Sequence, residues 1–205
     1  MSRLAELPSS IDYVTPRDRI HPLVINGGAH QAESSEHFGS SPPYVELRER
    51  KDILVFQSDL LKEDVEITGS ILVTLWVSSN ATDTDFTAKL LDIYPPTDDY
   101  PSGYHLNLAD SVIRTRYRNG FNEAQMMDPG KVYRVNIQLP PISNLFKEGH
   151  FIRLDIASSN FPKYDVNPNT GEALGRHTHM IKAVNTVYMD HIRPSNVIFP
   201  IVPKD

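Results

Sequence analysis

The sequence predicts an all-β protein with the fold of a jelly-roll β-sandwich. Apolar runs of strand length recur after Asp52 between turn residues, and the run from Tyr133 to Leu139 alternates apolar and polar side chains. Such alternation places the apolar set on one face of a half-buried strand. Many short strands in one chain favour a two-layer β fold, and 205 residues suffice for one structural domain with a substantial core.

The expected elements follow in chain order. Residues 1–50 are rich in Pro, Gly, Ser and His and show little periodicity, so we expect a long N-terminal arm that packs on the sandwich or on another domain. The sandwich itself is expected over residues 51–205, with one helical turn at 106–113. Its predicted strands are 53–56, 71–77, 86–93, 133–139, 151–156, 183–189 and 197–202. The last two are expected to pair antiparallel through a turn at 193–196.

Composition excludes several classes of function. The formal charge of −6 comes from interspersed acidic and basic residues without a basic cluster, so nucleic acid is not an expected partner. The chain has no cysteine, which excludes disulfides, thiol nucleophiles and thiolate metal sites. No run reaches the ~18 apolar residues of a membrane span, and no membrane partner is expected. The first residues lack a signal-peptide core, so we expect a cytoplasmic location if Met1 is the natural start.

The sequence offers no candidate nucleophile. An α/β-hydrolase displays its serine on Gly-x-Ser-x-Gly, because small flanking residues permit the strained turn, and no such pentapeptide occurs. The nearest string, residues 39–42, lacks the second glycine and a following helix. We therefore assign no catalytic residue.

Four residues are weak candidates for metal binding. His177 and His179 resemble the opening of a cupin metal motif, but the positions of the expected carboxylate hold Ala183 or Val184, which favours two exposed loop or strand histidines. Asp83 and Asp85 could bind a hard cation such as calcium. Calcium, however, takes about six or more oxygens, so a structural role in the turn is favoured and no cofactor is expected.

The loop of residues 158–171 is unusually rich in hydrogen-bonding side chains. A long loop without regular backbone pairing needs its own side chains to satisfy backbone groups, and two prolines stiffen this one. We interpret it as a structural brace or a docking surface. The residues assigned a structural role, here and at the start of the strand at 86–93, are Asp83, Asp85, Phe86, Ser158, Ser159, Asn160, Phe161, Pro162, Asn167 and Gly171.

Several motifs are more specific as an ordered set than singly. They are Ile67-Thr-Gly69 and the segments 77–95, 113–118, 129–133, 143–150, 158–165 and 167–171. From about Tyr13 to Pro203 their order closely resembles the C-terminal domain of the cocaine esterase (CocE/NonD) and X-Pro dipeptidyl-peptidase family of serine hydrolases.

The resemblance implies a place in a three-part enzyme. Such enzymes combine an α/β-hydrolase domain that carries a Ser-His-Asp triad, a helical cap and a C-terminal jelly roll similar to galactose-binding domains. This chain corresponds to the third part only, and none of its eight histidines matches the triad histidine. The implied partners are the hydrolase domain and the cap, and the domain is also a candidate for mediating homo-oligomers.

Three functions remain open from the sequence. The favoured one is a non-catalytic domain that supports structure, pocket shape and docking in an ester- or amide-hydrolysing enzyme. The second is a free-standing carbohydrate-binding module, in which Tyr94, Tyr100 or Tyr104 would stack on a sugar ring. The third is a metal-dependent jelly-roll enzyme that uses His177 and His179.

Overall fold

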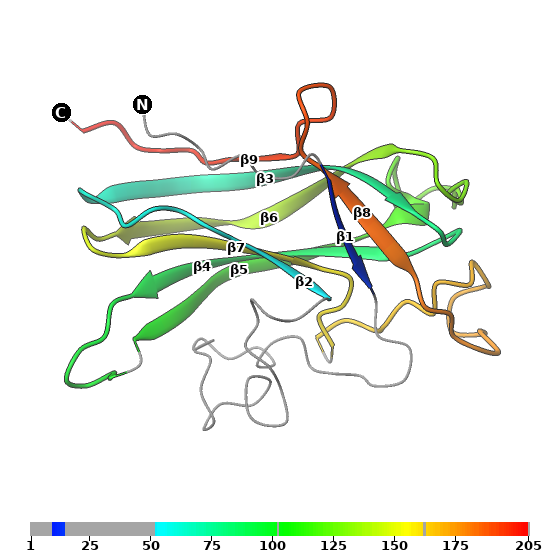
Figure 1. Ribbon diagram of the computed structural model, residues 1–205, viewed down its shortest axis with the longest axis horizontal. Coiled ribbons are helices and arrows are strands. Elements are labelled where there is room, and N and C mark those ends of the chain that lie inside the picture. Colours follow the sequence, from blue (N-terminus) through cyan, green and yellow to red (C-terminus); the bar gives the residue numbers. More distant parts are fainter. Residues whose placement is uncertain (1–9, 15–51, 102, 162, 205) are drawn as a thin grey trace.

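Two antiparallel sheets face each other in the computed structural model, which describes residues 10–14, 52–101, 103–161 and 163–204 (Figure 1). In the first sheet, called the β3 sheet, the strands run in the order β1-β8-β3-β6, and β9 also pairs with β3. In the second, called the β4 sheet, the order is β2-β7-β4-β5. This is the jelly-roll arrangement predicted from the sequence. The strands are β1 (Ser10–Val14), β2 (Ile53–Gln57), β3 (Val65–Ser79), β4 (Asp85–Tyr94), β5 (Tyr104–Arg114), β6 (Tyr133–Phe146), β7 (Phe151–Ala157), β8 (Val184–Tyr188) and β9 (Asn196–Ile198).

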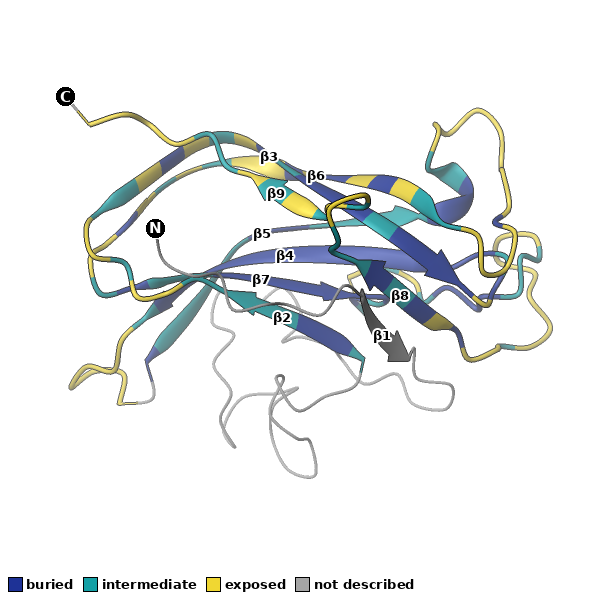
Figure 2. Cartoon of the chain, turned by 45° about the horizontal axis from the view of Figure 1, so that its top comes forward, coloured by how far each residue is buried: buried dark blue, intermediate teal, exposed yellow. Residues whose placement is uncertain are grey.

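The hydrophobic core lies between the two sheets. Alternate residues of β3 are buried between the sheets, where they pack with buried residues of β4 and β7. Figure 2 shows the buried residues in dark blue. Burying a Val, Leu, Ile or Phe side chain of this layer is worth roughly 1.5–3 kcal/mol, so this layer is the main source of stability. Its members include Ile71, Val73, Leu75, Val77, Phe86, Ala88, Leu90, Leu154 and Ile156.

The longest strand pair is β3 with β6, which is paired from Val65↔Phe146 to Val77↔Tyr133. Its register shifts between Gly69 and Ile71, opposite Pro140 and Pro141 of β6. Proline cannot donate to a ladder and is therefore confined to edges and irregularities of a sheet. The two prolines thus explain where the pairing is interrupted, and the strands continue on both sides.

The helical turn predicted at 106–113 is wrong, because this segment belongs to β5 and pairs with β4. The register passes from Leu90↔Ala109 to Leu91↔Asn107 and leaves Leu108 as an extra residue. Such a bulge breaks the two-residue alternation of a strand. The apolar residues consequently recur at spacings of three and four, as in a helix. Within the described residues the only helical element is the 3-10 turn Thr115–Tyr117.

The C-terminal strands do not form the predicted hairpin. Both β8 and β9 pair antiparallel with β3, through Trp76↔Tyr188 and Leu72↔Ile198. The prediction failed because the turn at 193–196 directs the chain back to β3: the Ser195 hydroxyl donates to the Tyr188 carbonyl at 2.6 Å and accepts from the Trp76 N–H at 2.9 Å.

Part of the predicted arm is a strand. Residues 10–14 form β1 along β8, and the other residues of 1–51 lie outside the described structure. Among the described residues, no helix is long and apolar enough to cross a bilayer.

Candidate functional site

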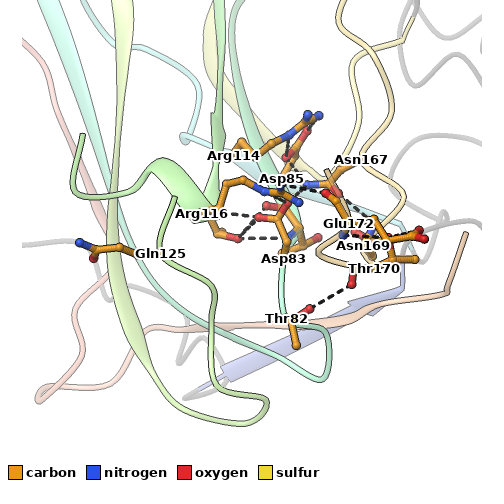
Figure 3. Close-up of polar contacts among 12 residues, drawn as sticks. Thr82, Asp83, Asp85, Arg114, Arg116, Gln125, Asn167, Asn169, Thr170 and Glu172 are labelled. Atoms are coloured by element: carbon orange, nitrogen blue, oxygen red, sulfur yellow. Dashed lines mark hydrogen bonds and ion pairs between the residues drawn. The ribbon is translucent and has the colours of Figure 1, made fainter. Parts of the chain in front are cut away.

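A buried ionic network lies where three segments meet: the turn before β4, the end of β5 with its 3-10 turn, and the loop 158–171 (Figure 3). Asp83 is at its centre and is fully buried. Its carboxylate accepts hydrogen bonds from the Thr115 hydroxyl at 3.0 Å, from the Arg116 backbone N–H at 3.0 Å and from Arg116 Nε at 2.7 Å. Asn167 Nδ2 donates a fourth, at 2.9 Å.

Asp85 forms the second carboxylate of this network. Arg114 donates to it in a bidentate manner, from Nε at 2.9 Å and from Nη2 at 2.8 Å, and Asn167 Nδ2 adds a contact of 2.7 Å. Burial raises the pKa of the Asp85 carboxyl above its ordinary value, whereas the hydrogen bond to Asp85 raises the pKa of Arg114. Arg114, Arg116 and Asn167 thus donate hydrogen bonds to the two carboxylates that the sequence analysis named as weak candidates for cation binding.

The loop 158–171 is attached to this network through its own side chains. Asn167 Oδ1 accepts the Asn169 N–H at 2.9 Å, and Asn169, at a φ of +63°, donates from Nδ2 to the Ile181 carbonyl at 2.9 Å. Gly171 has a φ of +76°, and a Cβ there would lie 2.7 Å from Thr82 Oγ1. These contacts attach the loop to the buried network, and its interpretation as a structural brace or a docking surface stays a prediction.

The start of the same loop reaches other buried polar groups. Asn185 Nδ2 donates to Ser158 Oγ at 2.8 Å, and Asn160 Nδ2 donates to Asp110 at 3.1 Å. Ser159 Oγ accepts the Phe161 N–H at 3.3 Å. Pro162, also predicted to be structural, lies outside the described residues.

Charged residues that the sequence analysis missed are buried on the β4 sheet. Asp110 pairs with Lys163 and lies 4.0 Å from Lys89 Nζ, and burial lowers the pKa of Lys89 to about 8. On β7, Arg153 donates to Asp155 at 2.8 and 3.1 Å. Charged residues two apart in an otherwise apolar strand share one face, and this spacing is the signal that could have revealed the pair.

His150 is the described histidine that most resembles a member of a catalytic triad. Its Nδ1 lies 2.8 Å from Asp92 Oδ1, Asn144 donates to the other oxygen of Asp92 at 3.1 Å, and the Tyr94 ring is 4.2 Å away. Among the described residues, no serine hydroxyl is hydrogen-bonded to a histidine ring. A nucleophile activated in this way is therefore not found in the part of the chain that the structure describes.

The other candidates are dispersed. His177 and His179 are exposed in the segment 171–183, which contains no strand, and His179 lies 3.7 Å from Glu172. The described residues contain no group of three potential metal ligands among His, Asp and Glu. Around the loop between β4 and β5, Tyr104 at the start of β5 packs against Tyr94 at the end of β4 and against Tyr100 in the loop, with ring centroids 5.8 and 4.8 Å apart.

The geometry defines a class of protein: a β-sandwich whose ends are fixed by structural ion pairs, without an assembled nucleophile in its described residues. Comparison with known proteins gives the family. A family profile described as the X-Pro dipeptidyl-peptidase C-terminal non-catalytic domain matches residues 13–198, and the chain belongs to this family.

The similar proteins named here are longer than this chain. The cocaine esterase of Rhodococcus sp. (strain MB1 Bresler) is 38% identical over 160 residues, which are 77% of this chain and 27% of that protein. An aminopeptidase from a marine sediment archaeon, Thaumarchaeota archaeon, superposes with a TM-score of 0.78 at 27% identity over 95% of this chain and 33% of its own. An α-amino acid ester hydrolase gives 0.79 at 25% identity, with 97% and 33% covered. The chain therefore spans about a third or less of these relatives.

Proposed function

We propose that this chain is the non-catalytic sandwich domain of a larger serine hydrolase that cleaves esters or amides through an acyl-serine. The observation that carries the proposal is the match of residues 13–198 to a non-catalytic C-terminal domain. The relatives named above are an esterase, an aminopeptidase and an ester hydrolase, all of which act at an acyl carbon. The nucleophile, base and acid would then belong to an α/β-hydrolase domain of the same protein.

The proposed work of the domain is to dock on the hydrolase domain and its helical cap and to fix their geometry. Exposed apolar residues in and beside the β3 sheet support a docking role. Figure 2 shows in yellow where exposed residues lie along β3, β6 and β9. Leu145 of β6 is paired with Glu66 of β3, and the Glu66 carbonyl accepts the Val202 N–H, so Leu145 and Val202 flank Glu66 on the outer face of the sheet. Leu145 and Val202 are 47% and 38% exposed. Clustered apolar side chains on a surface are typical of interaction sites.

A labelling experiment tests whether the chain is catalytic on its own. The purified 205-residue chain is incubated with a serine-directed fluorophosphonate and with an activated ester. We expect no stoichiometric labelling and no turnover above the buffer rate. Labelling of one serine per chain would overturn the proposal. A melting temperature unchanged by calcium or by a panel of sugars is also expected, and it separates this function from a carbohydrate-binding module.

A second experiment tests docking in the intact hydrolase. Aspartate at Leu145 and Val202 places charge on the proposed surface. Leu174→Asp is the matched control, because Leu174 is 49% exposed and lies outside the strands. The double variant should lower the melting temperature of the intact enzyme and leave that of the isolated chain unchanged. Equal behaviour of the double variant and the control in the intact enzyme would refute docking through this surface.

A further inference from the structure

An apolar cleft of about 480 Å³ opens between the two sheets. It lies on the side of the sandwich where β2, β8 and β9 meet the inward faces of β3 and β7. Its volume is within the ~300–1,000 Å³ typical of small-molecule sites. The apolar side chains in its walls are Val55, Phe56, Val73, Leu75, Ile152, Leu154, Ile156, Val187, Met189, Val197 and Phe199.

The chemistry of the cleft is uniform. Among the described residues that line it, none has a charged side chain, and its deep wall is formed by core residues such as Val73, Leu75 and Val187. Two of its few polar residues already have partners. The Ser58 hydroxyl donates to the Asp59 carbonyl at 2.7 Å and accepts the Ile152 N–H at 3.0 Å, and the Ser195 hydroxyl is held between Tyr188 and Trp76.

These properties select the class of occupant. Water needs two to four polar partners, and a peptide backbone inside the cleft would lose hydrogen bonds that the apolar walls do not replace. An aliphatic chain makes no such demand. We propose that the cleft binds an aliphatic chain, either alkyl or fatty acyl, whose polar head stays in water at the mouth. At roughly 30 Å³ for a group the size of a water molecule, the volume holds about 16 such groups, so a ten-carbon chain fits.

A homologous series of ligands gives the first test. Hexan-1-ol, octan-1-ol and decan-1-ol are titrated into the 205-residue chain by calorimetry. We expect saturable binding of one molecule per chain, with affinity rising about fourfold for each added methylene, since burying a methylene is worth about 0.8 kcal/mol. Absence of saturable binding, or affinity independent of chain length, would overturn the proposal.

Two neighbouring residues of β9 provide a matched pair of variants. Val197 lines the cleft, whereas Ile198 is on the other face of the strand and 59% exposed. Val197→Trp should fill the cleft and weaken decan-1-ol binding at least tenfold, and Ile198→Trp should leave it unchanged. Equal effects of the two variants would place the ligand elsewhere and contradict the proposal.

A measurement on the unmodified chain decides the matter even if Val197→Trp does not fold. Methyl NMR with decan-1-ol should shift the methyl signals of Val73, Val187 and Val197, while those of Ile192 and Ile198 remain in place. Contacts between ligand and protein protons confined to surface methyl groups would overturn the proposed site.

Discussion

Replacing Asp83 by asparagine tests whether the buried network holds the end of the sandwich together. The substitution keeps the shape of the side chain and removes its charge. Asp83 is fully buried and Arg116 is only 4% exposed, and the two are joined at 2.7 Å. The variant therefore leaves a buried guanidinium without a counter-charge.

The expected loss follows from burial rather than from the ion pair as such. Breaking a buried pair by removing one partner costs about 3–5 kcal/mol, because the remaining charge stays out of water. An exposed pair contributes about 0–1 kcal/mol, since water screens it and side-chain entropy opposes it. The control is Glu63→Gln, which breaks the 2.9 Å pair with Lys204, whose side chains are 73% and 56% exposed.

Equilibrium unfolding in urea measures both variants at neutral pH. We expect Asp83→Asn to lower the free energy of unfolding by about 3–5 kcal/mol and Glu63→Gln by less than about 1 kcal/mol. Removing the second charge as well, in Asp83→Asn with Arg116→Met, should recover part of the loss. Losses of similar size for the two single variants would refute the reasoning from burial.

Three further predictions concern single residues. Burial lowers the pKa of Lys89 to about 8, whereas an unfolded lysine titrates near about 10.4, so the folded state binds fewer protons than the unfolded state between these pH values. The free energy of unfolding should therefore rise by up to ~3 kcal/mol as the pH increases across this range. Urea unfolding at a series of pH values should show no such rise for Lys89→Met, and the same pH dependence in both proteins would contradict the assignment. Gly171→Ala should destabilise the domain by about 1–3 kcal/mol more than Gly130→Ala, because both glycines have a positive φ but only at Gly171 would the added Cβ meet a neighbouring atom. Equal melting temperatures of the two variants would exclude the clash with Thr82. Phe86→Ala should cost about 3–5 kcal/mol in urea, because Phe86 is fully buried, and a loss below ~1 kcal/mol would remove it from the core.

Much of the fold could be predicted because the strand signals are local. Alternation in β6 and apolar runs in β3 and β4 indicate strands without knowledge of their partners. Strand pairing is not local, and so the sequence could not show that β8 and β9 share β3 instead of pairing with each other. The wrong helical prediction for β5 has a related cause. The bulge at Leu108, which gives the apolar residues a helix-like spacing, depends on the pairing of β5 with β4.

The sequence indicated some residues of the buried network but not the partners of their side chains. Asp83, Asp85 and Asn167 were assigned structural roles from turn composition, and the structure joins them. The arginines that neutralise the carboxylates are about thirty residues away in sequence, on the adjoining strand and its 3-10 turn. Register alone brings them together, through the pairing of Asp85 with Arg114 at the end of the β4–β5 ladder.

The nested strand order constrains how this molecule is made. β4 pairs with its neighbour β5, whereas β3 pairs with β6, β2 with β7 and β1 with β8, so each successive pair encloses a longer stretch of chain. Loop closure costs more for each longer enclosure, and distant contacts slow folding. During synthesis the inner hairpin can form early, but the β4 sheet is not complete until β7 has left the ribosome, nor the β3 sheet until β9 has. Until then, the edges of the inner strands are exposed to misassembly.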